Sequence, residues 1–167
     1  MDLPGAAAKG VTVFNAPFSN TRSVAEKTIG ETIALQRKLF LASSQMHVGK
    51  WSKTATGSHE VRGKTLGIVG YGRIGSQVSV LAEGLGFKTL YWDTSKTLAL
   101  GNAVKADSME DLLSRADIVT LHVPETPETR DLITATEIAM MKPVSARDNR
   151  LQSARESAQC CRGRGRT

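Results

Sequence analysis

The sequence predicts an α/β fold built on an incomplete, doubly wound parallel sheet. Between residues 64 and 143, apolar segments of strand length alternate with segments of helix length, the pattern of parallel strands joined by helices. A glycine-rich turn joins the first of these strands to its helix. A long helical pattern precedes this region and an arginine-rich segment follows it. We therefore also expect a long N-terminal helix and a disordered C-terminal tail.

The part of the chain before the predicted sheet should contain a short strand and a long helix. Residues 10–15 have the composition of a strand, and Pro17 would end its hydrogen-bond ladder. Apolar residues then recur at helical spacing over residues 21–44, which predicts one helix longer than average. Ser23 and Glu26 have the spacing of a capping box and are expected to begin this helix.

The remaining elements follow a regular order. Residues 45–63 are polar and contain glycines, which favours an irregular, exposed connection. Beyond them, the pattern predicts strands at 64–70, 87–93, 103–105 and 117–124, and helices at 74–85, from 108 onward and at 134–141. Ser108 and Asp111 are spaced as a helix cap, and Thr134 or Thr136 is expected to cap the last helix.

The glycine-rich turn has the spacing Gly-x-Gly-x-x-Gly over residues 70–75. Gly70 permits a tight turn out of the strand, Gly72 lets the backbone approach a pyrophosphate, and Gly75 lets the helix pack closely on the strand. Unpaired amides at the helix start, together with the helix dipole, attract phosphate groups. Three glycines can fall in a loop by chance, but the flanking strand and helix favour a dinucleotide site of the Rossmann type.

Asp93 is the predicted acidic partner of this turn. It ends the second predicted strand, about 20 residues beyond the glycines, where dinucleotide sites place an acid. Its carboxylate would accept hydrogen bonds from ribose hydroxyls and repel a 2′-phosphate, which favours NAD over NADP, although Lys96 could weaken that preference. The motif residues predicted to contact the cofactor are Gly70, Tyr71, Gly72, Arg73, Gly75 and Asp93.

The composition restricts the class of protein. The chain has 167 residues and 40% hydrophobic content, enough for one domain with a core. It has no apolar run of about 18 residues and no signal-peptide pattern at its start, so we expect no membrane contact and a cytoplasmic location. Its two cysteines, Cys160 and Cys161, are adjacent and poorly placed for a disulfide. The sequence therefore predicts neither a disulfide framework nor a cysteine-based metal site.

Most of the net charge of +6 lies in the tail, residues 144–167, which holds six arginines and two acids. The rest of the chain is nearly balanced in charge. The tail also lacks aromatic residues on which bases would stack. A nucleic-acid partner is therefore not expected.

Three segments carry a resemblance to a known family: residues 13–26, 62–86 and 121–129. In these segments the sequence resembles the D-isomer-specific 2-hydroxyacid dehydrogenases, and the resemblance extends over about residues 2–143. It implies a Rossmann domain that binds NAD, and a small 2-hydroxyacid as the substrate of the intact family member. It also implies a homo-oligomer, because the long helix is similar to the family's dimer-forming element.

The resemblance implies roles for single residues and an organisation of the chain. Arg73 and Ile74 would contact the pyrophosphate. Val123 and Pro124 would line the cofactor, and Asn20 would face the substrate. From the residues alone, Asn20 is equally well explained as a turn residue that caps the following helix. The implied parts are a substrate-domain remnant at 1–20, a long helix and connector at 21–63, a partial NAD-binding domain at 64–143 and the tail at 144–167.

No catalytic residue is assigned. The resemblance implies an arginine, a glutamate and a histidine beyond a Met-Lys-Pro-Gly segment; residues 141–143 match that segment, whereas residues 144–150 do not match what should follow. His122 lies at a predicted strand end but has no acidic partner nearby in the sequence, so we interpret it as structural. We expect the NAD-binding portion of an oxidoreductase, inactive by itself. The alternative is a non-catalytic NAD-sensing or corepressor-like interaction module.

Overall fold

A computed structural model describes residues 2–51 and 53–142, so the predicted disorder of the tail lies outside the described residues. The centre of the structure is a four-stranded sheet in the order β3-β2-β1-β4. Each neighbouring pair of strands is parallel, which confirms the predicted sheet type. The strands are β1 (Thr65–Val69), β2 (Lys88–Trp92), β3 (Val104–Lys105) and β4 (Ile118–Leu121).

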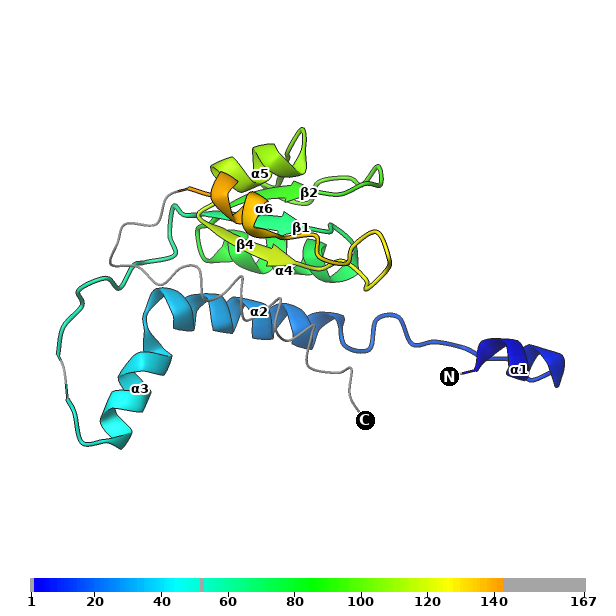
Figure 1. Ribbon diagram of the computed structural model, residues 1–167, viewed down its shortest axis with the longest axis horizontal. Helices are drawn as coiled ribbons and strands as arrows, with labels where there is room; N and C mark the ends of the chain where they lie inside the picture. Colours follow the sequence, from blue (N-terminus) through cyan, green and yellow to red (C-terminus); the bar gives the residue numbers. More distant parts are fainter. Residues whose placement is uncertain (1, 52, 143–167) are drawn as a thin grey trace.

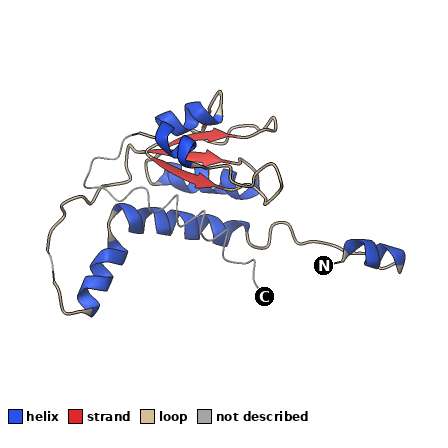
Figure 2. Cartoon of the chain, viewed as in Figure 1, coloured by secondary structure: helices blue, strands red, loops and turns tan. Residues whose placement is uncertain are grey.

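Helices cover both faces of this sheet (Figures 1 and 2). One face carries α4, against which α2 lies, and the other carries α5 and α6. The two remaining helices, α1 and α3, extend away from the sheet at opposite ends of α2. No helix in the described part of the chain is long and apolar enough to cross a membrane. The helices are α1 (Leu3–Ala8), α2 (Thr21–Gln36), α3 (Leu39–His47), α4 (Arg73–Gly84), α5 (Met109–Arg115) and α6 (Ala135–Met140).

The core has two halves, because successive residues of a strand point to opposite faces. On the α4 face, Leu66 and Ile68 of β1 are fully buried together with residues of α2 and α4. On the α5 face, Val69 is buried together with Leu112 and neighbouring residues of α5. This burial of both faces explains why β1 and β2 read as continuous apolar runs.

Two of the predicted helix starts are confirmed. The Ser108 side chain accepts a hydrogen bond from the Asp111 amide at the start of α5. At the start of α6, Thr134 and Glu137 form a capping box. The Thr134 side chain accepts a hydrogen bond from a backbone amide of the first turn, and the Glu137 side chain accepts one from the Thr134 amide. These caps satisfy amides that have no partner within the helix, and they fix where each helix begins.

The strand predicted at residues 10–15 is wrong. That segment is irregular and follows α1, a helix that the sequence analysis missed and that begins where the Asp2 side chain accepts from the Gly5 amide. A strand needs a hydrogen-bonded neighbour, and no described strand lies beside this segment. Phe14 is accordingly 87% exposed.

The single helix predicted at residues 21–44 is also wrong, because it divides into α2 and α3. Lys38 adopts the left-handed conformation between them, with φ of 56°. The carbonyl of Gln36, at the end of α2, accepts a hydrogen bond from the distant His59 amide at 2.9 Å. The Gln36 carbonyl would accept from a later amide of the same helix if α2 continued, but it accepts from His59 instead, and α2 ends there.

The predicted capping box at the start of α2 is wrong as well. Ser23 lies inside the helix and donates to the Asn20 carbonyl at 3.0 Å. Glu26 pairs instead with Arg22, one turn earlier, at 2.6 Å. Residues 48–51 and 53–63 are irregular as expected, whereas residues 45–47 belong to α3.

Candidate dinucleotide site

The candidate site lies where β1, β2 and β4 end side by side. In the register of the sheet, Val69 is aligned with Trp92 on one side and with Leu121 on the other. The next residue of each strand continues this edge: the Gly70 amide donates to the Trp92 carbonyl, and the His122 amide to the Val69 carbonyl. Ligands of open parallel sheets bind outside this carboxyl-terminal edge.

Two glycines of the turn are required by close packing. Gly70 has φ of +90°, and a Cβ there would lie 2.6 Å from the His122 carbonyl oxygen. A Cβ on Gly75 would lie 2.2 Å from the Gly70 carbonyl oxygen. Both contacts are far inside van der Waals distance, so neither position accepts a side chain without backbone movement. The structure places these residues as the spacing predicts.

The third glycine lies in a different environment. Gly72 occupies the N-cap position of α4, and a Cβ there would meet no atom within 4 Å. The Ser76 amide donates to the Gly72 carbonyl, so the amides of residues 73–75 belong to the first turn of the helix, where amides have no partner one turn earlier. Open space beside Gly72, next to amide donors at the positive end of a helix, fits a pyrophosphate.

Asp93 directly follows β2 and lies against the glycine turn. One of its carboxylate oxygens accepts from the Tyr71 amide at 2.6 Å, and the other from the Ser95 amide at 2.7 Å. These two bonds fix the orientation of the carboxylate, while each oxygen retains a lone pair for a further hydrogen bond. The carboxylate is therefore held beside the turn with the capacity to bind two adjacent hydroxyls.

The side chains of Tyr71 and Ile74 point into the protein. Tyr71 is 3% exposed, and Ile74 packs against the same core cluster. Because the Tyr71 amide is already donated to Asp93, that residue has no free group directed at the pyrophosphate position. Ile74 can contribute its backbone amide from the first turn of α4.

Arg73 and Asn20 lie in the same neighbourhood. Arg73 is exposed, and its guanidinium carbon lies 4.5 Å above the centre of the Phe18 ring, a cation–π contact. This contact brings the turn before α2 close to the start of α4. Asn20 belongs to that turn; it occupies the N-cap position of α2, but its side chain makes no capping hydrogen bond. Phe18 could not be singled out from the sequence, because an isolated aromatic residue in a turn carries no pattern.

The residues after β4 form the third side of the site. A Cβ on Gly70 would meet Val123 Cγ1 at 2.9 Å, so Val123 lies directly against the turn. Pro124 is exposed, and its carbonyl accepts from the Thr129 hydroxyl at 2.6 Å. These contacts place both residues at the carboxyl-terminal edge of the sheet, where the resemblance expects them.

His122 has the environment of a structural residue. Its Nε2 atom lies 3.1 Å from the Thr120 hydroxyl, and burial lowers the pKa of the imidazole to about 4. The ring is therefore neutral at pH 7. A group with so low a pKa is a weak general base at neutral pH. This environment supports the interpretation made from the sequence.

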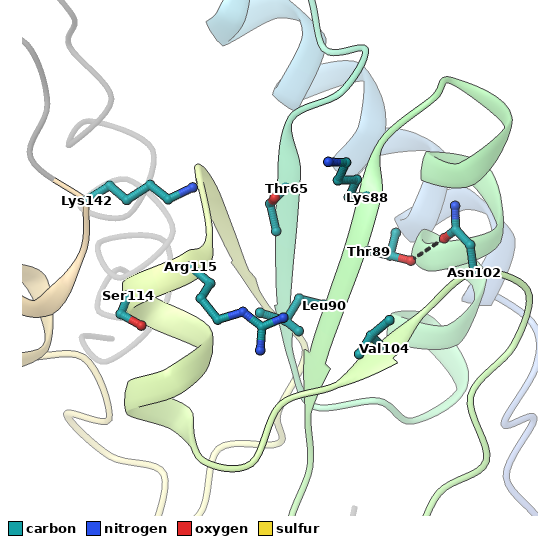
Figure 3. A pocket seen from close by; sticks show the side chains of 9 residues that line it. All are labelled: Thr65, Lys88, Thr89, Leu90, Asn102, Val104, Ser114, Arg115 and Lys142. Carbon is teal, nitrogen blue, oxygen red and sulfur yellow. Dashed lines mark hydrogen bonds between the residues drawn. The ribbon is translucent and has the colours of Figure 1, made fainter.

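A separate cavity lies at the opposite edge of the sheet (Figure 3). It has a volume of about 450 Å³ and is lined by residues near the amino-terminal ends of the strands, among them Thr65 and Lys88, together with Arg115 of α5 and Lys142. Lys142 donates to the carboxylate of Asp117 at 3.0 Å, and Arg115 pairs with Asp111 at 2.8 Å. Because two of its cations are already paired, we assign no ligand to this cavity.

The turn, the helix start and the fixed carboxylate together define a dinucleotide-binding α/β domain. Residues 29–146 match the family model described as D-isomer specific 2-hydroxyacid dehydrogenase, NAD binding domain. The chain therefore belongs to the D-isomer specific 2-hydroxyacid dehydrogenase family, as the resemblance implied. NAD is the cofactor of that domain.

The chain is also similar to individual proteins of known name. It is 54% identical over 142 residues to D-3-phosphoglycerate dehydrogenase of Haemophilus influenzae. The aligned region covers 85% of this chain and 35% of that protein. It is 54% identical to D-3-phosphoglycerate dehydrogenase 2 of Saccharomyces cerevisiae, covering 85% of this chain and 30% of the yeast protein. The chain thus spans about a third of the length of these relatives.

A solved structure agrees with the fold. The crystal structure of D-lactate dehydrogenase with NAD⁺ from Lactobacillus jensenii is similar with a TM-score of 0.75 at 30% sequence identity. The match covers 85% of this chain and 43% of that protein. The similarity confirms the Rossmann-type α/β fold that the sequence predicts.

Proposed function

We propose that this chain is the NAD-binding portion of a 2-hydroxyacid dehydrogenase of the D-3-phosphoglycerate type. The activity of the whole protein would be the oxidation of 3-phosphoglycerate at its 2-hydroxyl group, a step of serine biosynthesis. The 54% identity to D-3-phosphoglycerate dehydrogenases supports this substrate. The observation that carries the proposal is the open space at Gly72, at the start of α4, together with the carboxylate of Asp93 that is bonded to the neighbouring Tyr71 amide.

In the proposed complex, each candidate residue has one task. The backbone amides from Arg73 to Gly75 bind the pyrophosphate, and Asp93 accepts the ribose hydroxyls. Val123 and Pro124 border the cofactor at the end of β4, and Asn20 faces the substrate. Bound NAD supplies the acceptor for a hydride from the carbon that bears the hydroxyl group.

This chain is proposed to bind the cofactor without completing the reaction. Oxidation also requires a base that removes the hydroxyl proton. Among the described residues, His122 is the histidine at the site, and its low pKa makes it unsuitable. We therefore expect NADH binding without turnover of 3-phosphoglycerate. The predicted division into four parts and the cytoplasmic location remain predictions.

Asp93→Asn is expected to change which dinucleotide binds. The amide removes the negative charge that repels a 2′-phosphate, while its oxygen can still accept a backbone hydrogen bond. We expect the wild-type chain to bind NADH at least about 10-fold more tightly than NADPH, since the repulsion between one carboxylate and the 2′-phosphate should change the affinity by roughly tenfold. The variant should bind the two dinucleotides with affinities within about 3-fold of each other. Calorimetric titration measures both ratios.

Asp131→Asn is a matched control, because it removes one carboxylate charge from an exposed residue distant in sequence from the turn. It should leave the NADH to NADPH ratio as in the wild type. The absence of NADH binding by the wild-type chain would refute the proposed function. Equal binding of both dinucleotides by the wild type would refute the role of Asp93.

We further propose that two copies of the chain associate through α3 and residues 48–51. This part extends away from the sheet and makes few contacts with the rest of the described chain (Figure 1). It nevertheless carries large apolar side chains that are more than half exposed, a density that favours burial against a partner. These residues are Leu39, Phe40, Leu41, Met46, Val48 and Trp51.

Phe40→Glu is expected to convert a dimer into a monomer. A buried, unpaired carboxylate at an interface is strongly unfavourable, so the dimer should weaken by at least about 100-fold. Sedimentation velocity over a range of concentrations measures the change. Leu98→Glu is the control, because Leu98 is 89% exposed and lies outside α3. A wild-type chain that sediments as a monomer at all concentrations would contradict the proposal.

A further inference from the structure

Residues 94–102 form an irregular segment that begins directly after Asp93 and leads toward β3. We call residues 94–100 the β2 loop. The segment has no helix or strand of its own, so its position depends on side chains that hold it against the sheet. Asn102, at the end of the segment, is held by Glu83 and Thr89. Two buried tyrosines, one from the glycine turn and one from β2, hold the β2 loop itself.

The first of these contacts comes from Tyr71. Its hydroxyl lies 2.7 Å from the Ser79 hydroxyl and 3.2 Å from the Leu100 amide. The Ser79 hydroxyl donates its proton to the Ser76 carbonyl at 2.8 Å, so Tyr71 must donate to Ser79. The Tyr71 hydroxyl is then free to accept from Leu100. The chain of hydrogen bonds runs in one direction from the β2 loop into α4.

The second contact comes from Tyr91. Its ring stacks on that of Tyr71, with ring centres 3.8 Å apart and an angle of 22° between the planes. Its hydroxyl donates to the Thr97 carbonyl at 3.1 Å. Tyr91 is 2% exposed, and its bond to Thr97 is partly buried. The stacked pair thus holds the β2 loop at two points.

Tyr71 also holds Asp93. The Tyr71 amide donates to one carboxylate oxygen, while the Ser95 amide, from within the β2 loop, donates to the other. The orientation of the carboxylate therefore depends on Tyr71 directly and on the β2 loop through Ser95. Lys96, the exposed cation of this loop, follows immediately.

We propose that Tyr71 is a positioning residue for cofactor discrimination. Its hydroxyl holds the β2 loop in place, and the held loop keeps Asp93 oriented toward the ribose and restrains Lys96. The inference rests on the proposed NAD binding of this chain. If the hydroxyl is lost, Asp93 becomes less well fixed and Lys96 gains freedom to approach a 2′-phosphate. NADH affinity should then fall while NADPH affinity falls less or rises.

Tyr71→Phe tests the inference because it retains the stacked ring and removes only the hydroxyl. We expect amide hydrogen exchange in residues 95–101 to become at least about 5-fold faster, the effect of losing one net hydrogen bond. We also expect the NADH dissociation constant to rise about 5-fold and the NADH to NADPH preference to narrow by about 3-fold or more. Tyr91→Phe, which frees the loop at Thr97, should change all three quantities in the same direction.

Ser79→Ala is the matched control, because it alters the same buried network but leaves the bond between Tyr71 and Leu100 in place. Its cofactor preference should stay within about 2-fold of the wild type. The inference is overturned if Tyr71→Phe leaves exchange and preference unchanged, or if Ser79→Ala changes the preference as much as Tyr71→Phe. Amide exchange is measured without cofactor, so it tests the role of Tyr71 in holding the loop even if the wild type does not bind NADH. Failure of the wild type to bind NADH would refute the proposed function instead.

Discussion

Gly75→Ala is expected to destabilise the domain by at least about 3 kcal/mol, the upper range for overpacking a core. The added Cβ would lie 2.2 Å from the Gly70 carbonyl oxygen and 3.1 Å from Ile68 Cγ2. The first of these atoms belongs to the backbone and cannot rotate away. Relief therefore requires α4 to move off β1, which would open the buried packing between them and separate the first turn of the helix from the glycine turn.

Urea denaturation measures this loss of stability, and titration with NADH should show no binding. Gly84→Ala is the matched control on the same helix, because a Cβ at Gly84 would meet nothing within 4 Å. That variant should be as stable as the wild type or up to about 1 kcal/mol more stable, since alanine is the better helix former. A Gly75→Ala protein within 0.5 kcal/mol of the wild type, on the order of a neutral surface change, would show that the helix does not pack as described.

The elements from β1 to α6 could be predicted from the sequence because local patterns determine them. β1 and β2 are mostly buried and read as apolar runs, and Ser108 and Thr134 cap the helices that follow them. The glycine turn was predictable for the same reason, since its conformation depends on residues close together in the chain. Most predicted boundaries of these elements lie within one or two residues of those observed.

Two of the errors, the length of the helix at residues 21–44 and the strand at residues 10–15, concern contacts with distant parts of the chain. The end of α2 depends on the His59 amide, which reaches the Gln36 carbonyl from far along the chain. The expected strand at residues 10–15 failed because its local composition says nothing about whether a neighbouring strand exists. Helical and strand periodicity describe a segment by itself, so they show neither the bond from His59 nor the lack of a neighbouring strand.

The same limit applies to the candidate site. The motif identified Gly70, Gly75 and Asp93, and the structure brings them together at one edge of the sheet. The contact between Arg73 and Phe18 and the bond between Tyr71 and Leu100 join separate parts of the chain, so no spacing rule predicts them. They could be found only once the chain was folded.

Gly72→Ala is expected to weaken NADH binding by about 10-fold to 100-fold while leaving the fold intact. Gly72 has φ of −77°, which alanine adopts freely, and the new Cβ would meet no atom of the protein within 4 Å. That open space is where the pyrophosphate is proposed to lie. A methyl group there would push the phosphates away from the amides of α4 and cost one charge-assisted hydrogen bond or more, each worth about 1.5–3 kcal/mol.

The Gly72 variant separates cofactor binding from folding, which the Gly75 variant cannot do. Urea denaturation should show a stability within about 1 kcal/mol of the wild type, whereas calorimetry should show the loss of NADH affinity. Gly30→Ala serves as the control, because a Cβ there, in the middle of α2, would also meet nothing within 4 Å; its NADH affinity should be unchanged. If Gly72→Ala bound NADH as tightly as the wild type, the pyrophosphate would have to lie elsewhere, and the assignment of the space beside Gly72 would be wrong.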